Sequence, residues 1–265
     1  MNKIAKSIFL LAPLLASASF SQMALAGAAS ITFDKYRIVL DKNSQSAELT
    51  LRNSEGKNAE CLLDLSHYNF SQSNELLEVA SVKSTYMPAK KLLRYSPRSV
   101  SIPSQSSQRV KISYRRRANL TPGEYISFFR ISCSEKNENL VKGKPNIGAK
   151  VNYNLPVHVR IGDAAASTAF EVTSITPFAE GYKLALKQTR KGNRSLVGGL
   201  KLIDQGSGEV IKHIRNFSLY RPAEVENHVF ILDEKPSGNV LVEFSEKSNV
   251  FNRVTQKIEI KNALF

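Results

Sequence analysis

The 265-residue sequence contains no tryptophan, two cysteines and four histidines. The histidines are scattered singly and the cysteines, Cys61 and Cys133, lie far apart, so no ligand spacing typical of a metal site occurs. The G-x-S-x-G, H-E-x-x-H, P-loop and G-x-G-x-x-G patterns of common hydrolase, metalloprotease and nucleotide sites are also missing. These absences predict a protein with no metal, no cofactor and no enzymatic activity.

Long apolar runs are absent except near the N-terminus, where residues 8–15 are apolar apart from Pro13. Two lysines precede this run, and Ala24-Leu25-Ala26 follows it as a small-x-small cleavage site. The alternative, a membrane anchor, needs roughly 18 uninterrupted apolar residues, and this run is shorter and closes in serines. We therefore expect residues 1–26 to be a cleaved signal peptide for export, with no stable membrane insertion.

Acidic residues are scarce: 23 Asp and Glu stand against 37 Lys and Arg, which gives a net charge of +14. Loss of the expected signal peptide removes 26 residues and two lysines, and leaves 239 residues with a charge of +12. Such an excess predicts an anionic partner, which could be nucleic acid, an anionic lipid surface or acidic protein groups. Export argues against nucleic acid.

Apolar and polar residues alternate with a period of two through the expected mature chain, which is the period of half-buried strands. No segment after the signal peptide sustains a period of 3.6, so we expect less than about a tenth of helix. Many short strands separated by turn residues predict an all-β sandwich or barrel. The clearest alternating sets are Ala47, Leu49 and Leu51; Val110, Ile112 and Tyr114; Leu184 and Leu186; and Val240, Val242 and Phe244.

The strand pattern is interrupted from Gly162 to Thr168 by small and polar residues. About seven candidate strands precede this segment and about seven follow it, and each half has the size of one immunoglobulin-like sandwich. We therefore predict an N-terminal domain over residues 27–162 and a C-terminal domain over residues 163–265.

One predicted strand is unusually long, because apolar residues fill every odd position from 147 to 161. Ordinary strands have about five or six residues. The strand could simply pack into its own domain, or its early part could be an exposed edge that adds a strand to another protein. The candidates for the donated face are Ile147, Ala149, Val151 and Tyr153, whereas Leu155, Val157 and Val159 are assigned to the core.

Several segments, in order, resemble the periplasmic chaperones of the chaperone-usher pathway of fimbria assembly. The first domain contributes Phe33 to Asp41, Tyr95 to Ile102, Gln108 to Ile112, Leu120 to Tyr125 and Leu155 to Arg160. In the second domain, Gly192 to Leu200 is similar to the "G-N-r-S-x-x-G-d-l" motif of the archaic or alternative branches. Each motif is weak by itself, but their order and spacing cover nearly the whole mature chain.

The resemblance implies two immunoglobulin-like β-sandwich domains set at an angle, in a periplasmic protein. Members of this family bind fimbrial or pilus subunits that lack their last strand, and deliver them to an outer-membrane usher. The open groove of such a subunit would aggregate if left bare. Alternate apolar side chains of the donated strand fill the groove, and each buried aliphatic side chain contributes roughly 1.5 to 3 kcal/mol.

The resemblance also implies that basic residues between the domains hold the C-terminal carboxylate of the subunit. Arg37 matches the first-strand arginine of this anchor, and a guanidinium can bind a carboxylate through two parallel hydrogen bonds. A lysine is usual on the donated strand, but Pro156 occupies that position here. Arg130 or Lys150 could substitute for it. The run Arg115-Arg116-Arg117 is interpreted as a solvated strand end, or as a contact with the usher or a subunit.

Two cysteines in an exported protein predict one disulfide, although two separate buried thiols remain an alternative. With the strand order of an immunoglobulin-like domain, Cys61 lies in the third strand and Cys133 in the sixth. These strands are neighbours within one sheet, so a direct bridge between them is expected.

A fimbrial subunit or tip adhesin is the main rival interpretation. A subunit should carry an N-terminal extension of alternating apolar residues and should lack its last strand. Here the alternating strand is internal and two complete domains are expected, which favours the chaperone.

Overall fold

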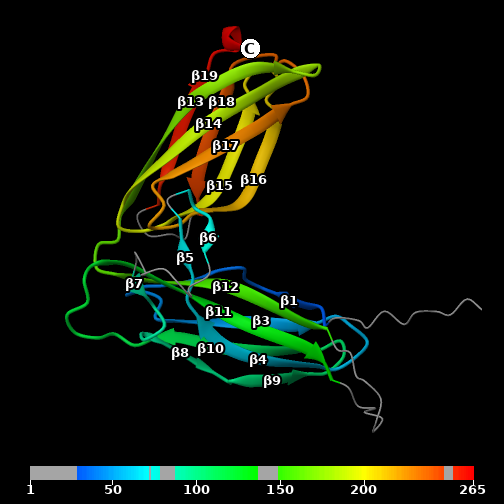
Figure 1. Ribbon diagram of the computed structural model, residues 1–265, viewed down its shortest axis with the longest axis vertical. Coiled ribbons are helices and arrows are strands. Elements are labelled where there is room, and N and C mark those ends of the chain that lie inside the picture. Colours follow the sequence, from blue (N-terminus) through cyan, green and yellow to red (C-terminus); the bar gives the residue numbers. More distant parts are fainter. Residues whose placement is uncertain (1–28, 72, 78–86, 137–148, 248–252) are drawn as a thin grey trace, which may run out of the picture.

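The computed structural model describes residues 29–71, 73–77, 87–136, 149–247 and 253–265, which fold into two β-sandwiches (Figure 1). In these ranges a single short 3-10 helix, Asn262–Leu264, interrupts a fold made of strands and loops. The predicted all-β fold is therefore confirmed. No helix within the described ranges is long and apolar enough to cross a membrane.

The first sandwich is immunoglobulin-like in its topology. One sheet has the order β1-β3-β10-β8 and the other the order β2-β12-β11-β4-β9, with β7 parallel to β11. The first two strands, β1 and β2, thus belong to different sheets, and the last strand, β12, lies beside β11, as in immunoglobulin domains. The strands are β1 (Ile31–Phe33), β2 (Ile38–Leu40), β3 (Ser46–Asn53), β4 (Ala59–Ser66), β7 (Met87–Pro88), β8 (Leu93–Ser96), β9 (Ser99–Ile102), β10 (Ser107–Tyr114), β11 (Gly123–Glu135) and β12 (Lys150–Ile161).

The core of this sandwich lies where the alternating pattern predicts it. Leu49 and Leu51 of β3 and Val110 and Ile112 of β10 are all fully buried, while the residues between them face outward. A side-chain period of two places every second residue on the inner face, so these rows meet the rows of the opposite sheet. The core expected from sequence is confirmed here.

The disulfide joins neighbouring strands of one sheet. Cys61 of β4 lies directly opposite Cys133 of β11, and the two sulfur atoms are bonded at 2.06 Å. Both cysteines are buried in the core. The predicted bridge is confirmed.

The second sandwich repeats the same kind of fold. Its sheets have the orders β13-β14-β17 and β16-β15-β18-β19. Leu184 and Leu186 in one sheet and Val240, Val242 and Phe244 in the other form its buried interior, as the alternation predicts. The strands are β13 (Ala166–Phe178), β14 (Gly181–Gly192), β15 (Leu196–Asp204), β16 (Val210–Leu219), β17 (Val225–Leu232), β18 (Val240–Glu246) and β19 (Thr255–Ile260).

The two sandwiches share no sheet, and the chain passes from one to the other between Ile161 and Ala166. Figure 1 shows the strands of the first sandwich running across the view and those of the second rising steeply from it. A small hairpin of β5 (Asn69–Phe70) and β6 (Leu76–Leu77) leaves the first sandwich and reaches the base of the second. The junction therefore has contacts besides the linker.

Candidate partner-binding edge and cleft

The first half of β12 is an open sheet edge. On one side β11 pairs with β12 from Lys150 to Ile161. On the other side β2 pairs in parallel only with residues Val157 to Val159. Among the described residues, no strand pairs with this second side between Lys150 and Pro156. Because unpaired strand edges offer N–H and C=O groups to another chain, this stretch is available for strand addition.

The predicted donor residues differ in how far they are engaged by their own domain. Val151 and Tyr153 are half-buried, and Ala149 lies just before β12 and is also half-buried. The Tyr153 hydroxyl accepts a hydrogen bond from Ile31 N at 3.2 Å, and its ring meets that of Phe33 edge to face. Tyr153 therefore contacts its own domain in the free chain, whereas Val151 is not among the described residues that pack against the core of the first sandwich. Ile147 lies outside the described residues.

The second half of β12 belongs to the protein itself. Leu155, Val157 and Val159 are buried in the core of the first sandwich, as expected. His158 and Arg160, on the opposite face, are buried at the junction with the second sandwich. The open edge thus ends where β12 becomes enclosed on both faces.

A cleft of about 430 Å³ lies beside this enclosed half, between the first segment of the chain and the second sandwich. Arg37 and Arg160 both line it, and Lys35 and Lys247 add two further positive charges. Two acids, Asp34 and Asp41, line it as well, so the lining has an excess of positive charge. The cleft is therefore electrostatically suited to an anion.

Arg37 stands directly before β2 and reaches across the cleft. Its Nη2 donates to the carbonyl of Asn216 at 3.4 Å and to the hydroxyl of Ser218, both on β16. Its Nε is buried and has no hydrogen-bond partner among the described residues. A buried donor without a partner is costly, so this nitrogen is suited to bind an incoming acceptor.

Arg160 also has a buried donor nitrogen without a partner among the described residues. The sequence analysis did not predict a role for this residue. Its Nε donates to Glu124 Oε2 at 3.1 Å, while its Nη2 is buried without a partner among the described residues. The alternation along β12 could have identified it, because Arg160 lies on the polar face two residues beyond His158. Only the packing of the second sandwich against that face makes it part of the cleft.

Arg130 and Lys150, the substitutes expected from the sequence, lie elsewhere on the same sheet. Arg130 of β11 forms a half-exposed ion pair with Asp64 of β4, with Nη2 3.0 Å from Oδ2. Lys150 is exposed at the start of β12, opposite Ser134. Neither residue lines the cleft, so their positions give these two predictions no support.

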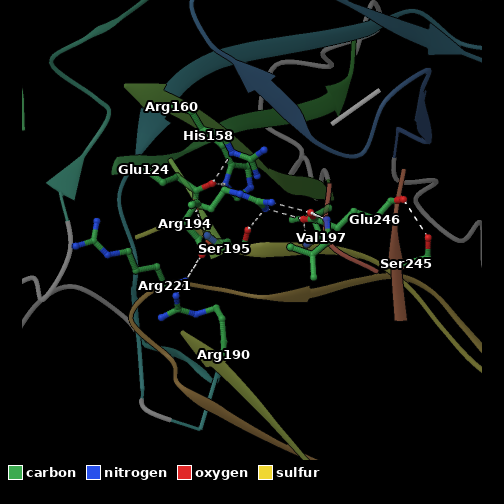
Figure 2. A network of polar contacts seen from close by, with 12 residues as sticks. Glu124, His158, Arg160, Arg190, Arg194, Ser195, Val197, Arg221, Ser245 and Glu246 are labelled. Atoms are coloured by element: carbon green, nitrogen blue, oxygen red, sulfur yellow. Dashed lines mark hydrogen bonds and ion pairs between the residues drawn. The ribbon is translucent and has the colours of Figure 1, made fainter. Parts of the chain in front are cut away.

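A buried carboxylate, Glu124, joins the two domains next to the cleft (Figure 2). Its Oε1 accepts a hydrogen bond from Ser195 N at 2.9 Å, and its Oε2 lies 3.2 Å from His158 Nδ1 and 3.1 Å from Arg160 Nε. The backbone N–H of Glu124 also donates to the carbonyl of Asn193 at 3.0 Å. These contacts fix Arg160 in place, since one carboxylate holds both the arginine and the second domain.

The charges in this network are set by its burial and its partners. Burial raises the pKa of Glu124, but the contacts with His158, Arg160 and Ser195 outweigh it and hold the pKa well below its ordinary value. Burial lowers the pKa of His158; Glu124 opposes this shift, whereas Arg160 and Arg37 add to it. Glu124 is therefore ionised at neutral pH and His158 is neutral.

The motif from Gly192 to Leu200 forms the second domain's side of this junction. Arg194 is fully buried and makes two parallel hydrogen bonds of 2.8 Å to Glu246, which also accepts from Val197 N at 3.1 Å. A Cβ at Gly192 would lie 2.3 Å from the carbonyl of Ala165, and one at Gly198 would lie 2.3 Å from that of Ser245. The glycines thus permit close backbone packing around the buried ion pair.

The β5–β6 hairpin provides a second connection between the domains. Asn74 at its turn donates from Nδ2 to the carbonyl of Ser218 at 2.8 Å and accepts from Tyr220 N at 2.9 Å. The ring of Phe70 stacks on that of Tyr220 with centroids 4.2 Å apart. Since Ser218 also contacts Arg37, the hairpin helps to hold one wall of the cleft.

Among the described residues, no group of three or more His, Cys, Asp or Glu side chains is placed to hold a metal ion.

The exposed Arg115, Arg116 and Arg117 follow β10 directly.

No family model and no curated protein matches the chain. Among solved structures, the chain is similar to the Pseudomonas aeruginosa CupB2 chaperone, with 9% identity over 85% of this chain and 98% of that one, at a TM-score of 0.48. It is also similar to the YadV chaperone, with 14% identity over 87% and 99% of the two chains and a TM-score of 0.47. A complex of the Salmonella enterica SafA pilin with the SafB chaperone gives 11% identity over 89% and 97%, with a TM-score of 0.44.

Proposed function

We propose that this protein is a periplasmic chaperone for fimbrial or pilus subunits, which holds each subunit by strand addition at the open edge of β12. The observation that carries the proposal is that edge, which is unpaired from Lys150 to Pro156 among the described residues and includes half-buried Val151. An incomplete sandwich gains both backbone hydrogen bonds and apolar contacts from such a strand. Several sequence segments of both domains resemble those of chaperone-usher chaperones, and this resemblance supports the same role.

The cleft gives the subunit a second point of attachment. Arg37 Nε and Arg160 Nη2 are two buried donors without partners on the lining of one cleft, and a carboxylate has two acceptor oxygens. In the proposed complex the C-terminal carboxylate of the subunit lies between these two guanidinium groups. This replaces the usual lysine, whose place Pro156 takes, with an arginine four residues farther along the same face of the strand.

Delivery to an outer-membrane usher completes the proposed role, and export by the N-terminal signal peptide brings the protein to the periplasm. The rival role as a fibre subunit is disfavoured by the sandwiches themselves. Each ends in a strand of its own, β12 and β19, that pairs within its own sheet. A subunit that depends on a donated strand would lack that last strand.

The anchor is tested by replacing Arg37 with alanine. Charge-assisted hydrogen bonds contribute about 1.5–3 kcal/mol, so Arg37→Ala should weaken subunit binding by roughly one to two orders of magnitude. The matched control is Arg52→Ala, which removes one exposed arginine from β3 of the same domain. Subunits encoded beside the chaperone are co-expressed with each variant, co-purified from the periplasm and titrated by calorimetry. Equal affinities for the two variants would remove Arg37 from the anchor.

A further inference from the structure

A second basic hollow of about 420 Å³ lies on the sheet β16-β15-β18 of the second domain. Lys201, His213, Arg215 and Lys247 line it. The single acid among the described lining residues, Glu243, is already paired with Lys257 at 2.7 Å. No carboxylate among the described residues forms an ion pair with Lys201, Arg215 or Lys247, so the hollow keeps a net positive charge.

Local backbone structure creates the hollow. The pairing of β15 with β16 shifts register between Gly198 and Leu200, opposite Arg215 and Asn216, which forms a bulge. Asn216 adopts a positive φ of 54° at this bulge. Bulges re-aim side chains, and here both bulged residues line the hollow. Gly199 has no side chain to fill the floor of the hollow. A Cβ at this position would lie 3.2 Å from His213 Nε2.

The hollow adjoins the cleft of the proposed anchor. Asn216 and Lys247 line both spaces. The carbonyl of Asn216 also accepts a hydrogen bond from Arg37, so the bulge that shapes the hollow is also the bulge that braces Arg37. A chain whose end lies in the cleft therefore has a direct route onto this sheet.

We propose that this hollow is a second anion-binding site that takes acidic side chains of the protein subunit whose C-terminus lies in the cleft. The assignment of the partner rests on the proposed function. The shape favours a polypeptide over a membrane, because a hollow in the face of the sheet admits single carboxylates, whereas a planar lipid surface would contact only what protrudes. The site thus selects subunits that carry Asp or Glu close to their anchored end.

His213 provides an internal reporter of occupancy. Burial lowers the pKa of His213, and the positive charges of Lys201 and Arg215 lower it further. A bound carboxylate would offset those two charges, so the pKa should rise when the hollow is occupied.

The test uses NMR titration of the mature protein with hexaglutamate blocked at both ends, which has side-chain carboxylates but no free terminus. We expect shifts at Gly199 and His213, a higher pKa of His213, and weaker binding at high salt. Lys201→Glu/Arg215→Glu should reduce the affinity at least tenfold. The matched control, Lys183→Glu/Lys191→Glu, makes the same charge change at exposed positions of β14 in the other sheet and should bind like wild type.

Two further samples separate the possible outcomes. Arg37→Ala titrated with a subunit tests the cleft anchor, whereas blocked hexaglutamate has no free carboxyl terminus to enter the cleft, so a failure of the anchor and a failure of the hollow give different results. Vesicles of anionic phosphatidylglycerol should produce no shifts at Gly199 and His213. Equal losses in the two double variants, unchanged binding by Lys201→Glu/Arg215→Glu, or shifts caused only by vesicles would each overturn the proposal.

Discussion

Replacement of Val151 by aspartate separates a donated strand from an ordinary core strand. Val151 lies on the open half of β12, opposite Cys133 of β11, and is half-buried in the free chain. In the proposed complex its side chain enters a pocket of the subunit. Loss of a buried valine costs at least about 1.5 kcal/mol, and an unpaired buried carboxylate adds several more. A total of about 3 kcal/mol or more corresponds to at least a 100-fold loss of affinity.

Asn152→Asp is the matched control. This neighbour is exposed on the opposite face of the strand, and the substitution introduces the same charge one position away. A strand alternates its faces, so this carboxylate should stay in water. We therefore expect Asn152→Asp to hold subunits like wild type.

The assay combines thermal unfolding of the free chaperone with the yield of soluble subunit after periplasmic co-expression. Val151→Asp should melt close to the wild-type temperature but lose its subunit to aggregation or degradation. Two results refute the reasoning. If the variant unfolds, Val151 belongs to the protein's own core, and if it folds and holds subunits normally, this face is not donated.

Two further predictions concern stability. The disulfide closes a loop between cysteines 72 residues apart, so Cys61→Ser/Cys133→Ser should lower the free energy of unfolding by about 4 kcal/mol in urea titrations, and an unchanged midpoint would contradict this. Burial lowers the pKa of His228 from 6.5 to about 4, so below pH 6.5 the unfolded chain takes up a proton before the folded chain does. The free energy of unfolding should therefore fall by about 3 kcal/mol between pH 7 and pH 4 through this group, and His228→Gln should remove that part of the slope.

The sequence predicted the features that depend on local pattern. The rows Leu49–Leu51 and Val110–Ile112 are buried as their alternation requires, and Cys61 meets Cys133 because neighbouring strands bring them into register. Position along the strand, rather than alternation, separated Val157, which is core, from the open start of β12.

The features that were missed depend on how the two domains pack. Arg160 looks like any polar-face residue until the second sandwich buries it beside Glu124. Asn74 carries no sequence signal for its contacts with Ser218 and Tyr220. Tyr153 fits the donor row by spacing, yet its hydroxyl is bonded to Ile31 N. Spacing determines the face of a strand but not what covers that face.

Amide hydrogen exchange along β12 tests the central claim most directly. In the free protein, amides between Lys150 and Pro156 that face away from β11 should exchange quickly, because no described strand pairs with that side. On binding a subunit they should become protected, while amides of the edge strand β19 in the second domain should not change. Protection confined to other surfaces, with fast exchange retained at Lys150 to Pro156, would show that the subunit is not held by strand addition at this edge.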